Sequence, residues 1–120
     1  MSGELAEHVK DLLSGLGPVE AKRMFGGHGI YLHRTMFALI ADDVLFLRSE
    51  VATAPAFDAL GLPPFRYDRA GRVIVMAYHQ APEDFLEDRA VAMHWGRQAC
   101  DAALRVRASK RVRQPKRPRR

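Results

Sequence analysis

Three glycines fall within four positions of the chain, between two apolar runs that favour β-structure. The segment runs Met24-Phe25-Gly26-Gly27-His28-Gly29-Ile30-Tyr31. Glycine is used where φ is positive or where two stretches of backbone approach closely. Three of them in a β-forming context indicate a tight turn, a bulge or a backbone surface that receives a partner. We therefore predict a hairpin here, in a domain that contains a β-sheet.

Short apolar segments on both sides of the glycines predict further strands. We expect strands at residues 19–25, 29–33, 36–41 and 44–48, and a second hairpin from residues 65–67 and 72–78. Asp42-Asp43 fits a two-residue hairpin connection, although Asn-Gly or Asp-Gly would be a stronger type I′ signal. Connections as short as these join only antiparallel strands, so the sheet is expected to be mostly antiparallel.

Helical patterns occur before, between and after these strands. Apolar residues at helical spacing predict a helix over residues 3–14 with Ser2 as N-cap, and residues 52–60 read as a short helix. Pro82 opens a helical region, and Asp88 is placed to cap the last helix. The apolar stripe of that helix is expected at Val91, Trp95, Ala99, Ala102 and Val106. The order of elements predicts an α+β domain with N-terminal and C-terminal helices packed on a sheet of antiparallel hairpins.

Several ordered blocks of the sequence resemble the N-terminal domain of the TfoX (Sxy) family of bacterial competence regulators. The signature turn of that family is matched by Arg23, Met24, Phe25, Gly26, Gly27, Gly29 and Tyr31. The likeness continues through residues 36–42, 44–48, 64–67, 75–78 and 82–86, and spans residues 5 to 107. A match of several blocks at compatible spacing is far more specific than a single glycine motif.

The resemblance implies a small α+β domain with an antiparallel sheet and flanking helices. It also implies a regulatory role in transcription or competence, exerted through an unidentified protein partner, with no catalytic activity. Full-length competence regulators carry a second domain, whereas this sequence ends in a short basic tail. We therefore expect a stand-alone member, with the TfoX-like domain at residues 1–107 and a disordered tail at residues 108–120.

The positive charge of the chain is concentrated at its C-terminus. The formal net charge is +5, from 19 Lys and Arg against 14 Asp and Glu. Residues 105–120 hold nine of the basic residues and none of the acidic ones, so residues 1–104 carry about −4. Such a run binds DNA or RNA without sequence preference, or it is only a solubilising extension. The candidate nucleic-acid contacts are Arg107, Lys110, Arg111, Arg113, Lys116, Arg117, Arg119 and Arg120.

No catalytic or metal-binding motif is apparent in the sequence. The glycine run lacks the Lys-Ser/Thr of a phosphate-binding loop, and a structural turn is favoured. Neither Ser14 nor Ser49 lies in a nucleophile motif, and Cys100 is expected to be a buried, inert thiol. His28 and His33 should lie on opposite faces of a regular strand, where they cannot share a metal. We predict no catalytic residues, no cofactor and no metal site.

Six aromatic residues of the predicted strands could serve either the core or a binding surface. We favour the core, because the domain itself is net acidic and stacking of bases without a positive groove is weak. These residues are Tyr31, Phe37, Phe46, Phe65, Tyr67 and Tyr78.

The cellular setting is expected to be the cytoplasm. No apolar run approaches the roughly 18 residues that span a bilayer. The N-terminus is polar and acidic rather than signal-like, and one cysteine cannot form an internal disulfide.

Overall fold

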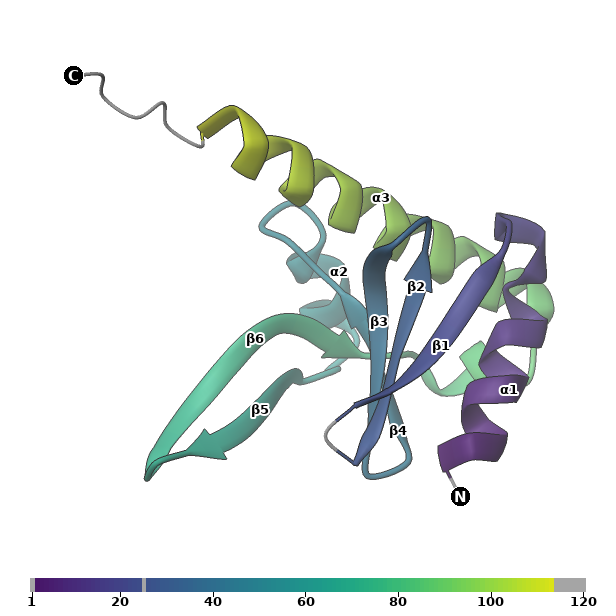
Figure 1. Ribbon diagram of the computed structural model, residues 1–120, viewed down its shortest axis with the longest axis horizontal. Coiled ribbons are helices and arrows are strands. Elements are labelled where there is room, and N and C mark those ends of the chain that lie inside the picture. The colour runs from purple at the N-terminus through teal and green to yellow at the C-terminus, as the bar shows by residue number, and fades with distance from the viewer. Residues whose placement is uncertain (1, 25, 114–120) are drawn as a thin grey trace.

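A six-stranded antiparallel sheet, with strand order β1-β2-β3-β4-β6-β5, forms the frame of the domain. The computed structural model describes residues 2–24 and 26–113. Figure 1 shows the helices beside the first four strands, while the β5–β6 hairpin projects away from them. The predicted α+β class is confirmed. The elements are α1 (Ser2–Leu12), η1 (Ser14–Leu16), β1 (Val19–Met24), β2 (Gly27–Leu32), β3 (Thr35–Ala41), β4 (Val44–Arg48), α2 (Ala54–Ala59), β5 (Pro64–Arg69), β6 (Arg72–Gln80), η2 (Glu83–Leu86) and α3 (Arg89–Arg113).

Two-residue turns with positive φ join the strands of the meander. Asp42 and Asp43 have φ of 51° and 62°, as expected for a type I′ connection. His33 and Arg34 take the same conformation, with φ of 50° and 68°. His33 therefore belongs to a turn, and the prediction that it lies on a strand is wrong by one residue.

The glycine segment is more strand than turn. Strand β2 begins at Gly27, which pairs with Met24 across the first hairpin. Gly27 and Gly29 therefore lie inside a strand, whereas Gly26, with φ of 80°, precedes it. The predicted start of this strand at residue 29 is two residues too late.

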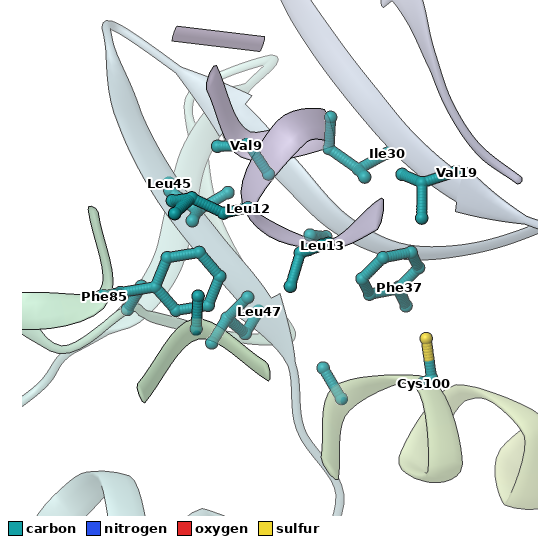
Figure 2. Packing of buried hydrophobic residues seen from close by; sticks show 14 of the residues in the cluster. Val9, Leu12, Leu13, Val19, Ile30, Phe37, Leu45, Leu47, Phe85 and Cys100 are labelled. Atoms are coloured by element: carbon teal, nitrogen blue, oxygen red, sulfur yellow. The ribbon is translucent and has the colours of Figure 1, made fainter. Parts of the chain in front are cut away.

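One hydrophobic core lies between the sheet and the helices. Helix α1 contributes Val9 and Leu12, and Leu13 follows directly after it; these side chains pack with Ile30 and Phe37 of the sheet (Figure 2). Helix α3 contacts β3 and β4 through small residues, which let its axis come close to the strands. Its buried positions are Ala92, Gly96, Ala99, Cys100, Ala102 and Ala103. The predicted stripe was correct at Ala99 and Ala102, but Val91, Trp95 and Val106 are only partly buried and flank it.

The helix boundaries differ modestly from those predicted. Helix α1 ends at Leu12 and is followed by a 3₁₀ turn, and the region after Pro82 is also 3₁₀ rather than α-helical. Asp88 caps α3 as predicted, since its carboxylate accepts hydrogen bonds from the amides of Ala90 (2.9 Å) and Val91 (3.3 Å).

Helix α3 continues to Arg113, six residues past the boundary that the sequence suggested for the domain. Residues 108–113 keep the helical backbone, and the division into a domain and a disordered tail stays a prediction. Charge repulsion at one helix end costs too little to unwind it there. Residues 114–120, for which disorder was also predicted, lie outside the described residues. None of the helices within the described ranges is long and apolar enough to cross a bilayer.

Candidate interaction surfaces

The glycines of the signature segment are required by close packing. A Cβ atom on Gly27 would lie 1.9 Å from the carbonyl oxygen of Ile40, so no side chain fits at that position. A Cβ atom on Gly29 would lie 2.7 Å from Sδ of Met24 and 2.8 Å from Sδ of Met36. The two glycines therefore let β2 sit tightly against β3 and let neighbouring side chains fold over it.

The remaining signature residues do not converge on one site. Arg23 is exposed on β1, opposite His28, while Tyr31 is half-buried and lies under the ammonium group of Lys22 at 4.9 Å. Phe25 lies outside the described residues. The contacts of the described residues assign the segment to the architecture of the sheet.

A polar relay of the buried Ser49 and His79 with the exposed Asp58 joins three residues that the sequence analysis did not connect. The Ser49 hydroxyl lies 2.8 Å from Nδ1 of His79, and Nε2 of His79 lies 3.4 Å from a carboxylate oxygen of Asp58. The imidazole also stacks on the ring of Phe57, with centroids 4.9 Å apart. The relay therefore fastens the end of β4 and the end of β6 to α2.

The order serine, histidine, aspartate resembles a catalytic triad, but this serine is poorly placed for attack. Only 1% of Ser49 is exposed, and its amide already donates to the carbonyl of Ala77 at 2.9 Å. A nucleophile needs room for a carbonyl carbon next to its oxygen, and free donors to stabilise the resulting oxyanion. The relay is better explained as a satisfied buried polar cluster. No sequence signal marks it, because its members are far apart in the chain.

Cys100 and the candidate metal ligands are further reactive side chains of the described residues. Burial raises the pKa of Cys100 to about 12, reinforced by the nearby Asp101 carboxylate and opposed by Arg97. The thiol is therefore protonated and unreactive near neutral pH, as predicted. Within residues 2–24 and 26–113, no group of three or more His, Cys, Asp or Glu side chains is arranged to hold a metal ion.

The β5–β6 hairpin, the loop after β4 and the second half of α3 enclose an open cleft of about 650 Å³. Val51, Val75 and Val106 line it, together with the polar relay at its base, and we call it the valine cleft. Exposed fractions are 93% for Val51 and 57% for Val75, while Val73, which shares the Val75 side of β6, is 62% exposed. Such apolar exposure is unusual in a small domain and is typical of an interaction site.

The aromatic residues of the strands divide between the core and the surface. Phe37 belongs to the core, and Tyr78 is buried beside Arg48, whose guanidinium lies 5.3 Å from the ring centroid. Tyr31, Phe46 and Phe65 are only half-buried, and Tyr67 is 36% exposed. The expectation that these residues serve the core is therefore wrong for most of them. The reason is that they point to the side of the sheet away from the helices.

The start of the basic tail is held against the domain. Nε of Arg105 donates to the Glu50 carboxylate at 2.6 Å, and the guanidinium of Arg107 donates to the hydroxyl of Thr35. The other seven candidate nucleic-acid contacts, from Lys110 onward, lie beyond the residues whose side chains are described. Nucleic-acid binding by the tail therefore stays a prediction.

Comparison with known proteins identifies the fold family. The model of the TfoX N-terminal domain matches residues 11–103. Protein Sxy of Escherichia coli strain K12 is 24% identical over 107 residues, which cover 88% of this chain and 50% of that protein. DNA transformation protein TfoX1 of Aliivibrio fischeri is 27% identical over 81 residues, covering 68% of this chain and 39% of that protein. The chain thus spans half or less of the length of these relatives. It belongs to the TfoX N-terminal domain family.

Proposed function

We propose that the protein is a non-enzymatic regulatory module that acts in competence or transcription by binding a protein partner. Similarity to DNA transformation protein TfoX1 of Aliivibrio fischeri supports the link to DNA transformation. The observation that carries the proposal of a protein partner is the valine cleft. Its exposed valines stand between a projecting hairpin and a long helix, where a partner segment can be held on two sides.

The energetics of the cleft favour a protein ligand over a small molecule. Burial of apolar surface contributes about 25 cal/mol per Å², so covering several exposed valines stabilises a complex by a few kcal/mol. The polar groups nearby are already committed, since Ser49 and Asp58 both pair with His79 and Glu50 pairs with Arg105. A small ligand would find few free groups to fix its orientation, whereas a protein segment needs mainly shape and apolar contact.

The test is an affinity pull-down from the native cell extract with nuclease present. We expect a protein to be retained by the natural chain and to be lost with Val75→Glu, because a carboxylate in the cleft would have to be desolvated. Leu60→Glu is the matched control, since Leu60 is also exposed but lies outside the cleft. Deletion of residues 108–120 should leave retention intact. Equal retention by Val75→Glu would exclude the cleft as the docking site.

A second candidate function is that of a nucleic-acid accessory protein acting through the tail. It is favoured by the nine basic residues between positions 105 and 120 and by the extension of α3 along part of that run. This function predicts salt-sensitive binding of duplex DNA. For each phosphate that the tail neutralises, the logarithm of the affinity should fall by about 0.9 when the salt concentration rises tenfold. Binding should vanish when residues 108–120 are removed. If the shortened chain binds duplex as well as the full chain, this function is lost.

A further inference from the structure

The side of the sheet turned away from the helices carries a continuous row of aromatic and basic side chains. Ring centroids of Phe46 and Phe65 lie 4.9 Å apart, and those of Phe65 and Tyr67 lie 5.9 Å apart, so the three rings share one side across β4 and β5. Tyr31 lies on the same side of the sheet. Its ring stands over Gly29, and Gly29 is aligned across the sheet with Leu39 of β3, which is aligned in turn with Phe46 of β4. We call this surface the open face and define it by Lys22, Tyr31, Phe46, Arg48, Phe65 and Tyr67.

The charge of the domain is separated between its two layers. The strands and their tight turns, residues 19–48 and 64–80, hold seven of the ten basic residues in positions 1–104 and only four of the 14 acidic ones. The helices and their connections hold the other three basic and ten acidic residues. Within residues 1–104 the sheet layer is therefore about +3 and the rest of the domain about −7, while the end of α3, residues 105–113, adds five positive charges. The overall value of −4, which argued against binding of a polyanion, is an average over two unlike surfaces.

The two cations of the open face each stand over an aromatic ring, Lys22 over Tyr31 of that face and Arg48 over the buried Tyr78. Nζ of Lys22 lies 4.9 Å from the centre of the Tyr31 ring, and the Arg48 guanidinium lies 5.3 Å from that of Tyr78. Among the described strand residues on this side of the sheet, Glu20 is the only carboxylate near these cations. Each cation can turn from its ring to a phosphate while the aromatic surface stays in place. An occupant that suits this pattern has planar apolar faces and regularly spaced negative charges.

We infer that the open face binds single-stranded nucleic acid. Bases stack on Phe46, Phe65 and Tyr67, whose rings are at least partly exposed, and the backbone phosphates pair with Lys22 and Arg48. Duplex is disfavoured, because its bases are already stacked on one another and cannot reach the rings. The site does not include the C-terminal tail, and it lies mainly on the opposite side of β6 from the valine cleft, with Arg48 at the margin that the two surfaces share.

The experiment measures fluorescence anisotropy of labelled 12-nucleotide oligo-dT and oligo-U strands. The protein is the 120-residue chain in which the Lys and Arg residues from 110 to 120 are replaced by Gln, so the tail adds no background. We expect Tyr67→Ala to weaken binding by about 5- to 100-fold, the range seen when one stacking side chain is removed. Tyr67→Phe should bind as the parent does, because it keeps the ring. Phe65→Ala should act as Tyr67→Ala does, after a thermal melt has confirmed that it folds.

Arg66→Ala is the matched control, because Arg66 is the neighbouring exposed residue of β5 and points to the opposite side. It should change the affinity by less than about twofold. Lys22→Gln and Arg48→Gln should each reduce the slope of log affinity against log salt by about 0.7, the value for one phosphate of a single strand. The stronger binder of oligo-dT and oligo-U identifies the class of nucleic acid. Unchanged affinity of Tyr67→Ala, or equal binding of an unlabelled duplex, would overturn the inference.

Discussion

The first and last hairpins of this sheet, β1–β2 and β5–β6, have the same antiparallel geometry but opposite surroundings. Strand β2 lies between two other strands and beneath α1, and half of its positions are buried. Strand β6 leaves the body of the domain together with β5, and most of its first seven positions are exposed (Figure 1). The comparison teaches that the segment which identifies the family offers little free surface. The surfaces suited to binding lie mostly outside that segment, on the β5–β6 hairpin and β4, and they include only Tyr31 of the signature residues.

The largest effect is expected from Gly27→Ala, which tests whether β2 is fixed by backbone contact. The added Cβ would meet the carbonyl of Ile40 at 1.9 Å, and because that atom belongs to a strand it cannot move without breaking the pairing of β2 with β3. We expect a loss of more than about 3 kcal/mol in the free energy of unfolding, measured by urea denaturation, or failure to fold.

Gly26→Ala is the control for that measurement. Gly26 has φ of 80° and open space around it, so alanine there meets only the strain of a left-handed backbone, about 1 to 2 kcal/mol. If the two variants lost the same stability, close packing of β2 would not be the reason for the second glycine.

Gly29→Ala should have an intermediate effect, about 1 to 3 kcal/mol in the same denaturation experiment. Its Cβ would approach the sulfur atoms of Met24 and Met36 and the ring of Tyr31, all of which are side-chain atoms that can shift. Met24→Ala combined with Gly29→Ala should recover part of the loss by removing one neighbour. Additive losses in the double variant would show that the neighbours do not limit this position.

Local patterns were enough to predict most of the first hairpin and its neighbours. The two short apolar runs and the Asp42-Asp43 turn between them fix the β3–β4 pairing, because they act over a few residues. The role of Gly27 could not be predicted in this way, since it depends on a carbonyl 13 positions away in the sequence. The sequence pattern placed Gly27 in a turn, whereas the turn residue with positive φ is its neighbour Gly26.

The exposed surfaces around the last hairpin could not be predicted from the sequence either, because they too depend on contacts between distant parts of the chain. Whether Phe46, Phe65 and Tyr67 face the core or the solvent depends on which side of the sheet the helices cover. The relay of Ser49, Asp58 and His79 likewise requires three elements to meet. Charge separation between the layers is hidden in any average over the chain, because strand segments rich in basic residues and helical segments rich in acidic residues follow one another along it.

Ser49→Ala tests how the base of the last hairpin is attached. The variant leaves Nδ1 of the buried His79 without its partner at 2.8 Å, which should cost about 1 to 2 kcal/mol in the free energy of unfolding. Asp58→Asn is the control, because the Asp58 side chain is largely exposed and its loss of charge should cost under about 0.5 kcal/mol. A larger loss for Asp58→Asn than for Ser49→Ala would reverse this account of the relay.

The smallest effect is expected from Val75→Thr, which tests whether the free surface of β6 contributes to folding at all. Thr keeps the shape and β-propensity of Val, and Val75 is mostly exposed, so the free energy of unfolding should change by less than about 0.5 kcal/mol. Ile30→Val removes one methylene from the buried strand β2 and should cost about 1 kcal/mol. If Val75→Thr weakened the partner retained in the pull-down while leaving stability unchanged, the valines would serve binding rather than folding. If it destabilised the domain as much as Ile30→Val does, the contrast between the two hairpins would fail.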